Sequence, residues 1–203
     1  MRSIACISTK GGVGKTSLVL NLALAAMHAG ERVLIVDADE QGSCITWATV
    51  RDEPTPVVEC VAPTDVAARL RTPGTYTLAI VDTAPRASTS LSALLRAVDF
   101  ALVPLRPSML DVATLGQSLA IVAAAKRPGA IVLNACPPRA PEIAETREAV
   151  RDLGLPLAPV EIAERRIYGR AVASGLAVVE FDPNSAAATE MSDLWKFVTR
   201  SLR

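Results

Sequence analysis

The stretch "ISTKGGVGKTS", Ile7 to Ser17, decides the fold of this chain. It places three glycines and two lysines between a short apolar run and a stretch with apolar residues at helical spacing. Glycines at such a strand-to-helix junction can turn successive backbone amides inward around phosphate oxygens. The stretch therefore predicts a nucleotide-binding loop, but it leaves open why the loop has a second lysine, Lys10, ahead of Lys15.

The phosphate-binding pattern G-x-x-x-x-G-K-[ST] is met only in part, because Thr9 stands where the pattern has its first glycine. Within the pattern, Lys15 is predicted to reach the outer phosphates and the Thr16 hydroxyl to ligate Mg²⁺. The other residues predicted to surround the nucleotide phosphates are Lys10, Gly11, Gly12, Val13, Gly14 and Ser17. A glycine-rich turn with a solvated lysine is the structural alternative, and the acidic motifs described below argue against it.

Composition limits the classes of protein that fit. A chain of 203 residues, 50% of them apolar, can bury a full core, and residues 1–203 are expected to form one domain. Basic and acidic residues balance at 21 each, so no overall field attracts nucleic acid or anionic lipid. The four cysteines show no C-x-x-C spacing, which argues against a metal or disulfide framework. Without a recognisable leader or apolar span, a cytoplasmic protein is expected.

Short apolar runs alternate along the chain with longer stretches of helical spacing. The runs predicted as strands are Ser3–Ser8, Arg32–Val36, Pro56–Cys60, Thr77–Val81, Phe100–Leu105, Ala130–Leu133 and Ala158–Ile162. The stretches predicted as helices are Lys15–His28, Ala62–Arg71, Ser88–Val98, Leu110–Lys126 and Glu142–Leu153. This alternation indicates an α/β fold of three layers, a mostly parallel twisted sheet with helices on both faces. Ligands of such sheets bind beyond the carboxyl ends of the strands.

Carboxylates stand at two of these strand ends. "RVLIVDADEQGS" carries Asp37 and Asp39, which alternation points in one direction, and "YTLAIVDTAP" carries Asp82. Acids that close buried strands beside a phosphate loop commonly hold the water shell of Mg²⁺. Each acid alone could equally be a helix cap or a surface charge. Together with the loop they predict a site for a nucleoside triphosphate and Mg²⁺.

The combined motifs resemble the ParA/MinD family of deviant Walker A ATPases. The resemblance rests on K-G-G-V-G-K-T with its leading lysine, followed by V-D-A-D-E-Q-G, V-D-T-A-P and "LVPLRPSMLD", and it covers the chain from Ile4 to Trp195. It implies the P-loop NTPase fold and ATP hydrolysis. The resemblance also implies why the loop has a second lysine. In this family Lys10 would reach the nucleotide of a partner subunit when two monomers close around two ATP molecules. ATP binding and homodimer formation are then linked.

The resemblance further implies roles for individual residues. Lys15 and Thr16 bind phosphate and Mg²⁺, Asp37 and Asp82 support the metal, and Asp39 orients the attacking water. Asn134, at the end of "AIVLN", is placed to read the adenine edge, and capping the strand end is an equally ordinary role for it. No N-K-x-D motif for guanine is present, so ATP is favoured over GTP.

Within the family the chain is most similar to short ParA proteins, which segregate plasmids or chromosomes or position a cellular cargo. The loop begins a few residues after Met1, so an N-terminal operator-binding domain is not expected. The resemblance implies a ParB-like or small adaptor that stimulates hydrolysis, location on the nucleoid, and a segment Pro104–Asp111 near the dimer face. Non-specific DNA binding needs local cations, for which Arg165, Arg166 and Arg170 are the candidates, with Lys196, Arg200 and Arg203 as neighbours.

Two other functions remain open on the sequence. The stretch "AATEMSDLWKFVTRSLR" carries Met191, Leu194, Trp195, Val198 and Leu202 at helical spacing and could bind a membrane, as in MinD. A last helix packed on the sheet is the simpler interpretation, since an apolar face is normal for such helices. An ATP-dependent metabolic enzyme of the dethiobiotin synthetase type is the third possibility, and the leading lysine and D-x-D-x-Q-G argue against it.

Overall fold

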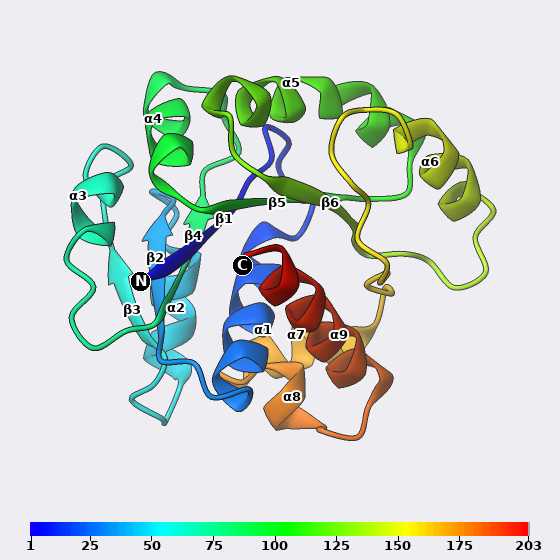
Figure 1. Cartoon of the computed structure of the whole chain (residues 1–203). Helices are drawn as coiled ribbons and strands as arrows, with labels where there is room; N and C mark the ends of the chain where they lie inside the picture. Colours follow the sequence, from blue (N-terminus) through cyan, green and yellow to red (C-terminus); the bar gives the residue numbers. More distant parts are fainter. Residues whose placement is uncertain (203) are drawn as a thin grey trace.

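The computed structural model describes residues 1–202, which form a six-stranded, entirely parallel sheet between two layers of helices. The strands are β1 (Arg2–Cys6), β2 (Val33–Ala38), β3 (Val57–Cys60), β4 (Leu78–Thr83), β5 (Phe100–Leu105) and β6 (Gly129–Leu133). Their order across the sheet is β3-β2-β4-β1-β5-β6 (Figure 1). The predicted α/β class with helices on both faces is confirmed.

Alternate residues of the strands supply two separate cores. The helices are α1 (Lys15–His28), α2 (Ser43–Val50), α3 (Val66–Leu70), α4 (Thr89–Ala97), α5 (Met109–Ala125), α6 (Glu142–Val150), α7 (Arg166–Ala173), α8 (Val178–Phe181) and α9 (Ala186–Ser201). Figure 1 shows α4, α5 and α6 on one face of the sheet and α1, α2 and α7 to α9 on the other. In β1, Ile4 faces the core built with α1 and α9, and Ala5 faces the core built with α4 and α5. Burial on both faces explains the near-continuous apolar strands.

The predicted seventh strand, Ala158–Ile162, is wrong as a strand. The segment runs beside β6 and makes isolated parallel bridges near its two ends, with the Ala158 amide donating to Ile131 and the Ile162 amide to Leu133. Between these bonds lies Pro159, which has no N–H to donate. An edge segment interrupted in this way follows the sheet without forming a continuous ladder.

Helix α9 belongs to the core rather than to a free amphipathic surface. Met191, Leu194, Trp195 and Val198 are buried and pack in the same cluster as the residues of α1. The packed-helix interpretation is therefore confirmed, and Arg203 lies outside the described residues. Within residues 1–202, no helix is both long and apolar enough to cross a membrane.

The sheet topology determines where a ligand can bind. β1 lies between β4 and β5, so the chain leaves β1 in one direction for β2 and later crosses to the other side for β5. Such a reversal opens a crevice beyond the carboxyl ends of the central strands. The predicted loop follows β1 at this point, and Asp37 and Asp82 stand near the ends of β2 and β4.

Candidate nucleotide and metal site

The loop between β1 and α1 has the backbone that its glycines predict, although not at every glycine. Gly12 and Gly14 have φ angles of 75° and 88°, in the left-handed region that glycine adopts without strain. A Cβ at Gly14 would lie 2.4 Å from the side-chain nitrogen of Asn134, so a larger residue there would displace this side chain from the Val13 carbonyl. Gly11 does not have a positive φ, and a Cβ there would meet nothing within 4 Å.

Thr9, the departure from the standard pattern, attaches the loop to α5. The Thr9 amide donates a hydrogen bond of 3.1 Å to the Ser118 hydroxyl, and the two hydroxyls lie 3.3 Å apart. Ser118 is buried in α5. A glycine at position 9 has no hydroxyl and could not contact Ser118. This chain therefore has a side-chain contact at the position where the standard loop has a conformationally free glycine. The sequence motif did not indicate this contact.

Lys10 is bound within its own chain. Its ammonium forms an ion pair with Asp111 near the start of α5, and the two side chains are 38% and 6% exposed. The second carboxylate oxygen of Asp111 is buried and has no hydrogen-bond partner among the described residues. Lys10 is thus held beside the loop by a carboxylate that lies 101 residues away in the sequence. Asp111 closes the Pro104–Asp111 segment and was not predicted as a site residue.

Lys15 and Thr16 open α1 and face the carboxylates of the central strands. Lys15 is only 7% exposed, and its positive charge acts on the side chains of Cys6 and Asp82. The Thr16 hydroxyl donates a 2.5 Å hydrogen bond to Oδ2 of Asp82. The first turn of α1 contains no acidic residue, so its free amides and Lys15 together favour an anion at the loop.

Asp37 and Asp82 are register partners on adjacent strands, and both are fully buried. Asp37 accepts hydrogen bonds from the amides of Cys44 at 2.9 Å and Ile45 at 3.2 Å, so it caps the first turn of α2. The cap that we considered as the ordinary role of such an acid is therefore present at Asp37. Each carboxylate oxygen carries two lone pairs, so capping does not prevent it from also binding a metal or its water.

The pKa of Asp82 is displaced upward, to about 6 from an ordinary value of 3.8. Burial is the main cause, because it disfavours the charged form, and the nearby Asp37 charge acts in the same direction. The hydrogen bond from Thr16 and the charge of Lys15 oppose the shift. A divalent cation would stabilise the carboxylate, and the buried carboxylates of Asp37 and Asp82 with the partly exposed Thr16 hydroxyl fit the preference of Mg²⁺ for oxygen ligands.

The Cys44 thiol lies beside the buried carboxylates of Asp37 and Asp82. Cys44, at the start of α2, lies with its Sγ 3.5 Å from Oδ2 of Asp82, the oxygen that also accepts from Thr16. Burial and the neighbouring carboxylates raise the pKa of Cys44 well above its usual range, so the side chain is a neutral donor to Asp82. The spacing of the four cysteines, which argues against a metal framework, did not indicate this contact.

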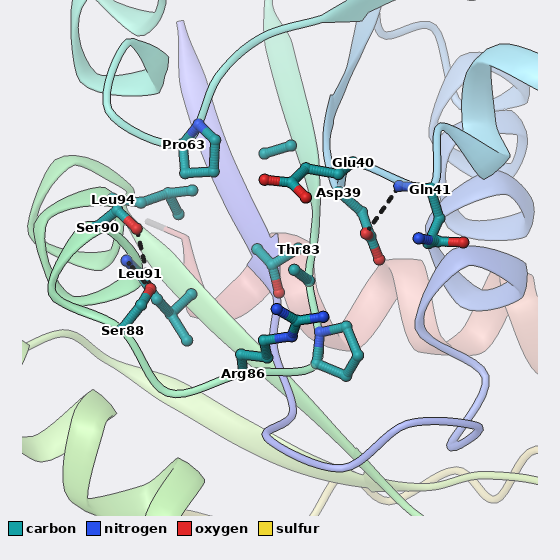
Figure 2. A pocket seen from close by; sticks show the side chains of 13 residues that line it. Asp39, Glu40, Gln41, Pro63, Thr83, Arg86, Ser88, Ser90, Leu91 and Leu94 are labelled. Carbon is teal, nitrogen blue, oxygen red and sulfur yellow. Dashed lines mark hydrogen bonds between the residues drawn. The ribbon is translucent and has the colours of Figure 1, made fainter.

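Asp39 lies in a separate cavity of about 410 Å³ between the loops that follow β2, β3 and β4. Its carboxylate accepts a 3.1 Å hydrogen bond from the Gln41 amide (Figure 2). Glu40 and Arg86 also line this cavity, with Leu91 of α4 at its apolar wall. Asp39 is partly exposed while Asp37 is buried, so the two acids of the D-x-D motif have different surroundings.

Asn134 contacts the other side of the phosphate loop. Its side-chain amide donates a 2.7 Å hydrogen bond to the Val13 carbonyl, and its backbone amide donates to Leu105. It lines a cavity of about 140 Å³ together with Gly14 and Ser17. Asn134 therefore fixes the loop in this structure and also borders a space beside it.

The three predicted DNA-binding arginines do not form one free cationic patch. Arg165 pairs with Glu190 of α9 at 2.8 Å, and the guanidinium of Arg170 lies 5.5 Å from the centre of the Phe181 ring. Arg166 is exposed and makes no ion pair within residues 1–202. Lys196 and Arg200 line a different groove, which also contains Arg147, Glu161 and Asp193.

Comparison with known proteins gives one family and a consistent fold. Residues 4–179 match the CobQ/CobB/MinD/ParA nucleotide-binding domain. A protein of Gloeobacter kilaueensis named "Maintenance of carboxysome distribution protein A" is 33% identical, covering 93% of this chain and 89% of its own length. The "Chromosome partitioning protein ParA" of Caulobacter vibrioides is 52% identical, over 23% of this chain and 17% of its own length.

Among solved structures, the septum site-determining protein MinD of Pyrococcus horikoshii, in complex with Mg-ADP, superimposes with a TM-score of 0.78. The match covers 97% of this chain and 95% of that one at 17% sequence identity. At this identity the likeness concerns the fold, and it extends over nearly all of both chains.

Proposed function

This chain belongs to the CobQ/CobB/MinD/ParA family of nucleotide-binding proteins, and from that membership we propose that it is an ATP-operated positioning switch. In this proposal, ATP binding drives homodimer formation, and the dimer distributes a cellular cargo along the nucleoid until an adaptor stimulates hydrolysis. The observation that carries the proposal is the partly exposed Lys10 beside the phosphate loop, a second cation that one subunit's own loop does not require.

The loop and the strand ends supply the nucleotide site. The amides of Gly11 to Gly14 and the Lys15 ammonium bind the phosphates, and the Thr16 hydroxyl with Asp37 and Asp82 holds Mg²⁺. Bound Mg²⁺ would neutralise phosphate charge there. Asn134 and Ser17 border the space beside the loop, where an adenine base would fit between the loop and the segment before α7.

Asp39 is the residue that we propose to orient the attacking water. It is the acid of the D-x-D motif that faces a cavity large enough for water, and within residues 1–202 its carboxylate accepts one hydrogen bond, from the Gln41 amide. Asp37, in contrast, is fully buried and accepts three backbone amides, which restrains it in a supporting position.

Dimer formation requires Lys10 to change partners. In the single chain its charge is neutralised by Asp111, so reaching a second subunit's nucleotide means breaking this pair. Two ATP molecules offer more negative charge than one carboxylate, which makes the exchange favourable only when nucleotide is bound. This competition links ATP occupancy to dimer formation.

The working surface is proposed to be DNA rather than membrane. Helix α9 has its large apolar residues in the core, which leaves no apolar face of α9 free for lipid within residues 1–202. Arg166 is the freest of the three proposed DNA contacts, and a dimer presents it twice. Similarity over 93% of the chain to a carboxysome distribution protein supports transport of a cargo, whereas the similarity to a chromosome partitioning protein covers only 23%.

The deciding experiment compares two surfaces. The ATP-loaded protein is passed over immobilised random duplex DNA and, separately, sedimented with anionic liposomes, with ADP as the control nucleotide. We expect ATP-dependent retention on DNA that weakens steeply as salt is raised. Replacing Arg166 and Arg170 by Glu should weaken retention without altering ATP-induced dimerisation, while Arg165 is kept because it lines the proposed adenine space. Liposome binding without DNA retention would support the MinD-like alternative instead.

A further inference from the structure

A sulfur atom lies among the oxygen atoms of the candidate Mg²⁺ site. Asp37, Cys44 and Asp82 are all buried, and one potential ligand atom from each lies within 4.8 Å of the other two. The Cys44 Sγ already contacts Asp82 Oδ2 at 3.5 Å. Neighbouring ligand atoms in a tetrahedral metal site are separated by about 3 to 4 Å, as metal–sulfur bonds of about 2.3 Å and metal–oxygen bonds of about 2.0 Å require.

The chemistry of these three donors differs from that of an Mg²⁺ site. Mg²⁺ takes oxygen ligands and keeps several of its waters, so it gains nothing from a thiol. Zinc and cadmium bind thiolate strongly and accept carboxylate oxygens as additional ligands. Three protein donors of this kind leave the fourth position for water. The cluster borders the phosphate loop, where the partly exposed Thr16 hydrogen-bonds to Asp82, and we take this to be the side from which an ion enters.

We propose that Asp37, Cys44 and Asp82 form a binding site for a thiophilic divalent cation of the zinc class. On binding, the Cys44 thiol releases its proton to solvent, its sulfur bonds to the metal, and one oxygen of each aspartate completes the protein ligands. The positive charge of the ion stabilises two carboxylates that otherwise lie side by side in the core.

Occupancy of this site prevents normal use of the nucleotide site. Asp82 Oδ2 accepts the Thr16 hydroxyl, so an ion bonded to Asp82 lies directly beside the hydroxyl that is proposed to hold Mg²⁺. The ion also takes up the carboxylates that support Mg²⁺, and both statements rest on the proposed ATPase cycle. A zinc-class ion therefore acts as an inhibitor that competes with Mg²⁺, and Cys44 is the residue that makes the chain sensitive to it.

The binding test uses the full chain without nucleotide or Mg²⁺, so it does not depend on the proposed function. Cys60 is the exposed cysteine among the four, and Cys60→Ser removes this surface thiol beforehand. Cadmium is then added while the ultraviolet charge-transfer band of cadmium thiolate is recorded. We expect a band that saturates at one cadmium per chain, is displaced by zinc, and disappears in the Cys60→Ser, Cys44→Ser variant. Asp37→Asn in the same background should weaken cadmium binding by at least about tenfold.

Serine at position 44 keeps a hydroxyl donor for Asp82, so this variant is expected to fold, and circular dichroism with thermal unfolding checks it. Cys44→Ala serves in its place if the serine variant does not fold. A band of equal strength in the folded position-44 variant would assign the sulfur to Cys6 or Cys136 and overturn the proposal. Absence of a band in the folded Cys60→Ser protein would overturn it as well.

A second measurement tests inhibition. ATP hydrolysis at saturating Mg²⁺ is titrated with zinc for the Cys60→Ser protein and for the variant that also carries Cys44→Ser, each relative to its own zinc-free rate. We expect at least about tenfold more zinc for half-inhibition when Cys44 is absent. Equal zinc sensitivity would refute the inhibitory role even where cadmium binds. Absence of any ATP hydrolysis would refute the proposed function and leave the cadmium result unaffected.

Discussion

Asp37 of β2 and Asp82 of β4 lie side by side as register partners on adjacent parallel strands, each one residue before the end of its strand. Ionising two buried carboxylates on neighbouring positions of adjacent strands costs free energy when no cation is bound. The pKa of Asp82, raised to about 6 mainly by burial, reflects this cost. The arrangement is unfavourable for the empty protein and favourable for one that holds a divalent cation.

The first prediction concerns the pH dependence of stability. Because the folded-state pKa of Asp82 is about 6 and its ordinary value is 3.8, the folded chain keeps a proton between these two pH values that the unfolded chain has lost. The contribution of Asp82 to the free energy of unfolding is therefore fully present at low pH and is lost as the pH rises through about 6. Asp82→Asn should stabilise the metal-free protein at about pH 7.5 by roughly 3 kcal/mol, and much less at about pH 4. Urea unfolding at both pH values measures this, and an equal gain at both would contradict the assigned cause.

The second prediction concerns the loop lysine. Lys15→Ala should weaken ATP binding by about 30-fold or more, since removing one partner of a buried charge pair costs at least about 2 kcal/mol. Titration calorimetry measures the affinity. Lys196→Ala is the matched control, because Lys196 is an exposed lysine paired with Asp193. An unchanged affinity in the Lys15 variant would remove our assignment of the phosphate site.

The third prediction separates the two partners of the Lys10 ion pair. Lys10→Ala should retain nucleotide binding and lose ATP-induced dimerisation, which light scattering detects. Asp111→Asn should have the opposite effect, promoting dimerisation by up to about fivefold, because a partly exposed pair contributes about 0.2 to 1 kcal/mol. Normal dimerisation of the Lys10 variant would leave the second lysine unexplained. Asp193→Asn, in an exposed pair, should change nothing.

The fourth prediction distinguishes neighbouring acids in one cavity. Asp39→Ala should bind ATP and accumulate as a dimer, while hydrolysis falls by about 100-fold or more, as expected when a residue that positions or activates the nucleophile is removed. Glu40→Ala tests the neighbouring carboxylate of the same cavity and should hydrolyse ATP at the normal rate. Phosphate release and sedimentation velocity give the two readouts. Equal losses in both variants would point to a general effect of charge in the cavity.

The fifth prediction tests the placement of α9. Leu194→Ala should destabilise the fold by about 2 to 5 kcal/mol, because Leu194 is completely buried. Leu110→Ala is the matched control, since Leu110 is 77% exposed, and it should leave the free energy of unfolding nearly unchanged. Urea denaturation compares the two. A small loss at Leu194 would mean that α9 is not held in the core and would reopen membrane binding.

The sequence was sufficient for features that depend on local pattern. The loop from Ile7 to Ser17 and the acids at the strand ends were predictable because glycine conformations and strand-end positions are properties of a few consecutive residues. Helix α2 was missed because "SCITWATV" contains Ile, Thr and Val, which favour strands, and because its first turn is stabilised by Asp37. The predicted strand at Ala158–Ile162 was wrong because Pro159 has no N–H and interrupts the hydrogen bonding to β6.

The unpredicted parts of the site depend on contacts between distant segments. Asp111 meets Lys10, and Ser118 meets Thr9, only because α5 packs against the phosphate loop more than 100 residues after it. Cys44 has no sequence signature, and its significance comes from lying 3.5 Å from Asp82. A single sequence carries no signal for such pairs, because their spacing is set by the topology of the sheet.

The position of β1 also matters for fluorescent imaging of this protein in cells. Because all strands run parallel, β1 begins at Arg2 at the amino-terminal ends of the strands, opposite the phosphate loop, and the Arg2 amide donates a hydrogen bond to the Thr77 carbonyl just before β4. A reporter attached ahead of Arg2 therefore emerges away from Lys10 and Asp39. A fusion joined directly before Arg2 leaves the nucleotide side uncovered, so the labelled chain should bind nucleotide as the unlabelled one does.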